Sequence, residues 1–108
     1  MKDDFKIVWS SFAESQIDEI FEYYKHIAGI EIAKNLIQGI VNAPNKLIKT
    51  PFIGQNEPRL KHRLVHYKYL IYKNYKLIYS VDEENGYIKV ADVFDTRQNP
   101  IKIGRGKI

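Results

Sequence analysis

Two histidines and an arginine lie close together in the middle of the chain, at His62, Arg63 and His66. Histidine titrates near neutrality, and internal cleavage of RNA needs a base for the 2′-hydroxyl and an acid for the leaving oxygen. These residues therefore form a candidate acid–base site, and a surface loop in which the histidines have no role is the alternative. A metal site is not expected, because no third ligand lies nearby and the neighbouring cations would repel a divalent ion.

The histidines belong to a basic stretch, residues 59–76, that holds six Lys or Arg and no acid. Its tyrosines alternate with the cations, and an open sheet face with this mixture would suit single-stranded RNA, because cations bind phosphates and aromatic rings stack on bases. The alternative is that tyrosine is a strong strand former with lysine as its solvent-side neighbour. The tyrosines in question are Tyr67, Tyr69, Tyr72 and Tyr75.

A third group with chemical potential follows the apolar run at residues 87–94, where Asp95 and Arg97 lie in a polar stretch that ends at Pro100. A buried strand would deliver both side chains to one edge of a sheet, where Arg97 would contact an anion or a partner. In the alternative, Asp95 caps the turn by accepting the N–H of Arg97 or Gln98, and Arg97 pairs with a carboxylate.

Charge is unevenly distributed along the chain. The net charge is +4, but residues 1–50 carry six Lys and seven acids, whereas residues 51–108 carry eleven Lys or Arg and six acids. A further acid-free group of cations closes the chain at Lys102, Arg105 and Lys107. This asymmetry indicates an anionic partner, either nucleic acid or an acidic protein segment.

Length and composition indicate one soluble domain over residues 1–108, with residues 1–4 and 104–108 expected to be flexible tails. The chain has no cysteine, which favours a reducing cytoplasm. It shows neither the plan of a signal peptide nor an apolar run long enough for a membrane span. The glycines are too scattered for a phosphate-binding loop, so no cofactor is expected.

Periodicity predicts the elements that position these residues. A strand at residues 5–10 precedes a helix that should start with a Ser11–Glu14 capping box and end at Gly29. A second helix, over residues 30–48, should kink or restart at Pro44. Ile27 and Val41 are among the apolar residues expected to face inward. Residues 50–58 read as a surface loop, and three strands follow at residues 67–72, 75–81 and 87–94, of which the last is expected to be central.

The predicted fold is therefore α+β. An N-terminal strand, an antiparallel two-helix hairpin and a three-stranded antiparallel meander form one twisted sheet, with the helices covering one face.

Three segments in this order, residues 7–14, 67–81 and 93–100, resemble the signature segments of the ParE/RelE superfamily of type II toxin–antitoxin toxins. The last segment, Val-Phe-Asp-Thr-Arg-Gln-Asn-Pro, is the most specific and is more similar to the ParE branch. The resemblance implies a small cytosolic toxin, held inactive in a hetero-oligomer with a cognate antitoxin that covers its basic surfaces. ParE-like members inhibit DNA gyrase, whereas RelE-like members cut mRNA on the ribosome.

The resemblance also separates the two branches. Nucleases of the family rely on basic residues of the sheet and on a Tyr or His near the end of the last strand or in the tail. Asp95 stands where many relatives have histidine, and no Tyr or His follows Tyr87. Gyrase inhibition is therefore favoured. A metal-independent endoribonuclease using His62, Arg63, His66 and Arg97 is the second hypothesis, and a non-toxic RNA- or protein-binding module is the third. Residues expected to contact target or antitoxin are Arg59, Lys61, Arg63, Lys68, Asp95, Arg97, Lys102 and Arg105.

Overall fold

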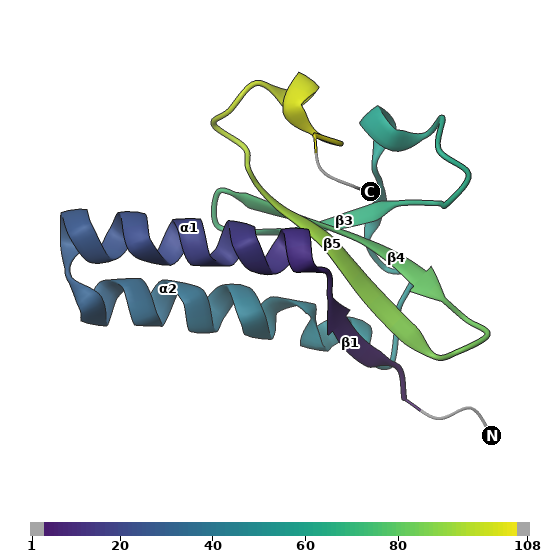
Figure 1. The fold of residues 1–108 in the computed structure, drawn as a ribbon. Coiled ribbons are helices and arrows are strands. Elements are labelled where there is room, and N and C mark those ends of the chain that lie inside the picture. Colours follow the sequence, from purple (N-terminus) through teal and green to yellow (C-terminus); the bar gives the residue numbers. More distant parts are fainter. Residues whose placement is uncertain (1–3, 106–108) are drawn as a thin grey trace.

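A five-stranded mixed sheet and a helical hairpin make up the computed structural model, which describes residues 4–105 (Figure 1). The strands are β1 (Lys6–Trp9), β2 (Gln55–Asn56), β3 (Lys68–Tyr72), β4 (Tyr75–Asp82) and β5 (Tyr87–Asp95). The α-helices are α1 (Ser11–Ala28) and α2 (Ile30–Asn42), and three short 3₁₀ helices follow them in the chain, η1 (Ala43–Leu47), η2 (Pro58–Leu60) and η3 (Pro100–Lys102). None of the helices described here is long and apolar enough to cross a membrane.

The α+β class is confirmed, but the strand arrangement differs in detail from the prediction. The sheet order is β1-β5-β4-β3-β2, so β4 is the middle strand and β5 lies second. β1 pairs with β5 in parallel, and the other pairs are antiparallel. The predicted loop at residues 50–58 contains β2, which sequence patterns did not indicate because it is only two residues long.

The two helices begin and end at residues with clear physical roles. Ser10, and not Ser11, is the N-cap of α1, because its Oγ accepts a hydrogen bond from the Ala13 N–H at 3.0 Å. Gly29 caps the C-terminus as predicted, with its N–H bonded to the Lys25 carbonyl and a positive φ of 96°. Pro44 lies in the first turn of η1, so the chain restarts there as a 3₁₀ helix.

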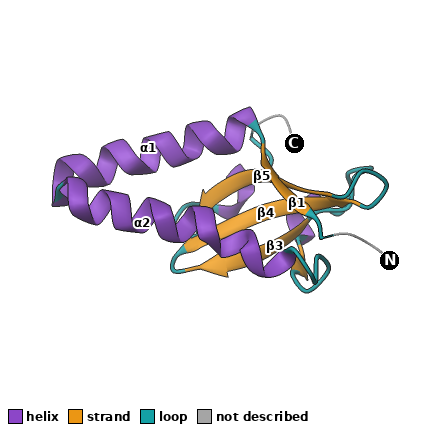
Figure 2. Cartoon of the chain, turned by 90° about the horizontal axis from the view of Figure 1, so that it is seen from below, coloured by secondary structure: helices purple, strands orange, loops and turns teal. Residues whose placement is uncertain are grey.

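The helices cover one face of the sheet and project beyond its edge (Figure 2). Ala13 and Ile40 are fully buried against sheet residues such as Leu77 and Val90. Ile27 and Val41 were predicted to face inward, but both are exposed. For Ile27 the reason is its place in the last turn of α1, in the part of the hairpin that projects past the strands.

A β-bulge in β5 changes which side chains face the helices. Ile78 pairs with Asp92 and Tyr79 pairs with Val90, so Ala91 is the extra residue. Val90 and Val93 both belong to the helix-side core, although they are three positions apart. The intervening bulge thus reverses the alternation and turns the buried Asp92 side chain to the opposite face.

The opposite face carries a smaller core of its own. It lies beneath η2 and η3, the two short turns above the sheet in Figure 1. Tyr67 and Tyr69 pack against it, half-buried. The buried residues of this second core are Leu60, Ile78, Phe94 and Ile103.

The two adjacent serines before α1 allow a matched test of the cap. Ser10→Ala should lower the free energy of unfolding by about 1–2 kcal/mol, since Ser10 Oγ also donates to the Ala91 carbonyl at 3.1 Å. Ser11→Ala should change it by less than about 0.5 kcal/mol. Urea unfolding of both variants measures the difference, and equal losses would contradict the assignment of Ser10 as the N-cap.

Candidate functional site

The end of β5 is a closed turn held by one carboxylate. Asp95 accepts the backbone N–H of Arg97 at 2.9 Å and the Arg97 Nη2 and Nε at 2.7 and 2.9 Å. The Arg97 hydrogen bond lowers the pKa of Asp95, and Asp95 in turn raises the pKa of Arg97. Asn74 donates to the same carboxylate at 3.2 Å. Asp95 therefore caps the turn, as in the alternative interpretation of this segment. The carboxylate that pairs with Arg97 is also that of Asp95.

A groove of about 320 Å³ lies between α1 and this turn. Tyr23 and Tyr24 of α1 form one wall, and Arg97 lies on the other, with its Nη2 3.5 Å from the Tyr24 hydroxyl. Tyr75 lies at the floor, where burial, followed by a hydrogen bond to Tyr24, raises its pKa. Arg97 is still exposed over 60% of its side chain, so it keeps surface for an external contact.

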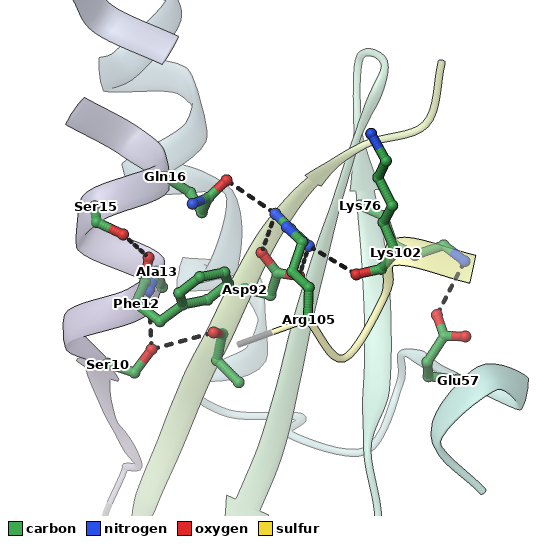
Figure 3. Close-up of polar contacts among 11 residues, drawn as sticks. Ser10, Phe12, Ala13, Ser15, Gln16, Glu57, Lys76, Asp92, Lys102 and Arg105 are labelled. Atoms are coloured by element: carbon green, nitrogen blue, oxygen red, sulfur yellow. Dashed lines mark hydrogen bonds and ion pairs between the residues drawn. The ribbon is translucent and has the colours of Figure 1, made fainter. Parts of the chain in front are cut away.

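A second ion pair holds the end of the described chain against the sheet (Figure 3). Arg105 donates to the fully buried Asp92 carboxylate with distances of 2.7 and 3.2 Å, to Gln16 of α1 at 2.9 Å and to the Lys102 carbonyl at 3.4 Å. Its guanidinium lies over the rings of Phe12 and Phe94. Burial raises the pKa of Asp92, and the charge of Arg105 partly offsets this effect. Arg105 therefore acts mainly as an internal anchor; residues 106–108 of the predicted tail lie outside the described residues.

A third ion pair, which sequence reasoning missed, joins Glu57 to Lys76. The Glu57 side chain is fully buried, and its Oε1 lies 3.0 Å from Lys76 Nζ (Figure 3). Its Oε2 accepts the Arg59 N–H at 2.8 Å, which caps η2. Lys76 also lies 4.2 Å from the centre of the Tyr69 ring. An acid directly before a proline, at the start of a turn, is the sequence signal that could have indicated a cap.

The residues predicted for acid–base chemistry have separate partners. His62 Nε2 lies 3.2 Å from Arg63 Nε, and His66 Nε2 lies 2.8 Å from Asn56 Oδ1. Arg97 lines the groove beside α1, whereas Arg63 lies close to Gly104. His62 and Arg63 are therefore in contact, whereas no hydrogen bond within residues 4–105 joins either histidine to Arg97, so the four side chains do not form one site. Across the same residues, no cluster of three His, Asp or Glu could hold a metal ion.

The four tyrosines of the basic stretch do not form an open stacking surface. Tyr72 and Tyr75 pack against the core on the helix side, whereas Tyr67 and Tyr69 pack against the second core. Because they lie on opposite faces and are packed, the predicted platform for single-stranded RNA is wrong. Sequence alone could not separate the faces, since the strand alternation starts anew after the turn at Lys73.

The remaining predicted contact residues differ in how free they are. Lys68 donates to Asn56 Oδ1 at 3.0 Å. Arg59, Lys61 and Lys102 are exposed, and none of the three forms an ion pair within the part of the chain that the structure describes. These three cations are therefore available to an external anion.

The comparisons with known proteins agree with this geometry. The family model described as "ParE toxin of type II toxin-antitoxin system, parDE" matches residues 7–100. The chain therefore belongs to the ParE toxin family of type II toxin–antitoxin systems. A comparison with curated proteins gives no significant match.

Two solved structures share the fold. One, described as the chromosomal ParDE toxin–antitoxin system from P. aeruginosa, has a TM-score of 0.69 at 18% identity and covers 84% of this chain and 95% of that chain. The other, a YoeB/ParE toxin from Agrobacterium tumefaciens, has a TM-score of 0.50 at 18% identity and covers 82% and 94%. At this identity the two similarities establish the fold alone.

The buried Glu57–Lys76 pair has an exposed counterpart that serves as a control. Lys76→Met should lower the free energy of unfolding by about 3 kcal/mol, because it leaves the Glu57 carboxylate buried without its cation. The double variant E57Q/K76M should recover much of that loss. Lys89→Met removes the partner of Asp82 from a surface pair in which the Lys89 side chain is 53% exposed, and it should cost less than about 1 kcal/mol. Equal costs for the two lysines in urea unfolding would contradict the assigned role of Glu57.

Proposed function

We propose that this protein arrests growth by inhibiting DNA gyrase and that a cognate antitoxin neutralises it. The observation that carries the proposal is the ParE family match over residues 7–100, combined with the chemistry at the end of β5. By its resemblance to the family, Asp95 stands where many relatives have histidine, and its carboxylate accepts hydrogen bonds from Arg97. A carboxylate bound in this way is a poor proton donor or acceptor, which favours binding over catalysis.

Ribosome-dependent cleavage of mRNA is the second candidate function. The basic residues of segment 59–76 favour it, because phosphoryl groups need nearby cations. His62 and His66 would have to supply the acid and base, and each already has a neighbouring partner. The proposal places the toxin in the cytoplasm, where gyrase and the ribosome are both accessible, in a hetero-oligomer with its antitoxin.

The first test separates the two activities. Expression of the chain without an antitoxin should arrest growth, and the purified protein should inhibit supercoiling of plasmid DNA by gyrase. Intact supercoiling together with site-specific cuts in translated mRNA would replace gyrase inhibition with nuclease activity. Harmless expression would contradict both toxic functions and leave a non-toxic binding module.

The second test concerns Arg97, the cation at the mouth of the groove. Arg97→Ala should abolish growth arrest while lowering the free energy of unfolding by less than about 1 kcal/mol, since the pair with Asp95 is exposed on the Arg97 side. Arg97→Lys keeps the positive charge but loses the bidentate hydrogen bonding to Asp95, so this variant should retain part of the activity. Lys73→Ala, in the exposed turn before β4, is the control for loss of a cation elsewhere. A large loss of stability in Arg97→Ala would show that Arg97 serves the turn and not a target.

A further inference from the structure

The turn between β4 and β5 contains the one Asn-Gly pair in the sequence, Asn85–Gly86. It lies at the end of the sheet away from the projecting part of the helical hairpin (Figure 1). An asparagine before a glycine is chemically labile, because the next backbone nitrogen can attack the side-chain carbonyl carbon and glycine has no side chain to obstruct it. Asn85 is exposed, and a methyl group added at Gly86 would meet no atom within 4 Å beyond its chain neighbours. The surroundings of this pair are therefore open.

Asp82, the last residue of β4, binds both groups that would react. Its carbonyl accepts the Gly86 N–H at 2.8 Å, and its Oδ2 accepts the side-chain amide of Asn85 at 2.9 Å. Its Oδ1 accepts the backbone N–H of Asn85 at 3.2 Å. These hydrogen bonds from Asn85 lower the pKa of Asp82, so the carboxylate is ionised at neutral pH. One residue thus restrains the attacking nitrogen and the amide that it would attack.

The same turn supports the edge strand β1. The Gly86 carbonyl accepts the Lys6 N–H at 2.9 Å, and Lys6 opposite Tyr87 is the first pair of the parallel ladder between β1 and β5. Residue 85 also follows three consecutive acids, residues 82–84. A change in the main chain at this point would therefore move an anchor of β1, and an added negative charge would be repelled by its neighbours.

We propose that Asn85–Gly86 is a site of spontaneous deamidation and that Asp82 protects it while the protein is folded. In the reaction the Gly86 nitrogen gives its proton to water and bonds to Asn85 Cγ, and the bond from Cγ to Nδ2 breaks. Ammonia leaves with a proton taken from water, and a five-membered succinimide ring remains. Water then opens the ring at either of its carbonyl carbons, which gives isoaspartate or aspartate. The net change is the gain of water and the loss of ammonia.

The products damage the turn in two ways. Isoaspartate adds one carbon to the main chain before Gly86, which displaces the carbonyl that holds Lys6. Both products replace the amide that donates to Asp82 by a carboxylate. Unfolding frees both reacting groups, so deamidation occurs chiefly in molecules in which this turn has opened, and it makes their loss irreversible. The inference concerns the lifetime of the folded chain and is independent of the proposed function.

Incubation of the purified full chain at mildly alkaline pH, followed by peptide mass spectrometry and chromatographic separation of the isoaspartate peptide, tests the proposal. Asp82→Ala removes both carboxylate hydrogen bonds to Asn85 and should raise the rate of deamidation there by about tenfold. Asp82→Asn keeps an acceptor for the Asn85 backbone N–H, so its rate should lie between those of Asp82→Ala and the unchanged chain. The unchanged chain in concentrated urea should react at least as fast as folded Asp82→Ala.

Lys89→Met is the matched control, because it removes the ion-pair partner of Asp82 but neither hydrogen bond to Asn85, and its rate should stay within about twofold of the unchanged chain. Asn45, which is exposed and precedes a lysine, reports general unfolding within each sample. An unchanged rate at Asn85 in Asp82→Ala, an equal rise at Asn45, or equal rates at Asn85 in the folded and urea-unfolded chain would each overturn the proposal. Thermal unfolding checks that each variant is folded. If Asp82→Ala is unfolded, the comparison of the unchanged chain with and without urea decides.

Discussion

The β-bulge at Ala91 is the constraint on which most of the functional surface depends. By adding one residue to β5, it turns Asp92 and Phe94 toward the face opposite the helices and returns Val93 to the helix-side core. The Ala91 carbonyl also accepts the Ser10 hydroxyl, so the start of α1 is tied to the same point. Without the bulge, the alternation of β5 would place Asp92 on the helix-covered face, away from its partner Arg105.

Two buried carboxylates, Asp92 and Glu57, form ion pairs on the face of the sheet opposite the helices. Burying two charges costs about as much free energy as their attraction returns, so such pairs contribute more to specificity of position than to stability. Here each pair links a 3₁₀ turn to a central strand, through Arg105 in one case and Lys76 in the other. The two ion pairs thereby hold the short segments that contain η2 and η3 in fixed positions relative to the sheet.

Local patterns predicted the helices, the meander and the family, because periodicity, turn residues and caps act over a few positions. Gly29 and Pro44 are examples, since their backbone chemistry alone decides where helices end or restart. The cap of α1 was misplaced by one residue because Ser10 and Ser11 offer the same hydroxyl, and contact with β5 selects Ser10. The parallel pairing of β1 with β5 and the two-residue β2 arise from contacts between distant segments, which no local pattern encodes.

The sequence by itself determined which charges the protein has and, through local periodicity, where α1, the start of α2 and the three strands of the meander lie. Only the tertiary structure decided which of those charges remain available. Lys76 and Arg105 appeared equivalent to Lys61 and Lys102 along the chain, but the first two meet buried carboxylates and the last two meet solvent. The physical reason is that the desolvation cost of a charge depends on its surroundings in three dimensions, and strand register and the bulge set those surroundings.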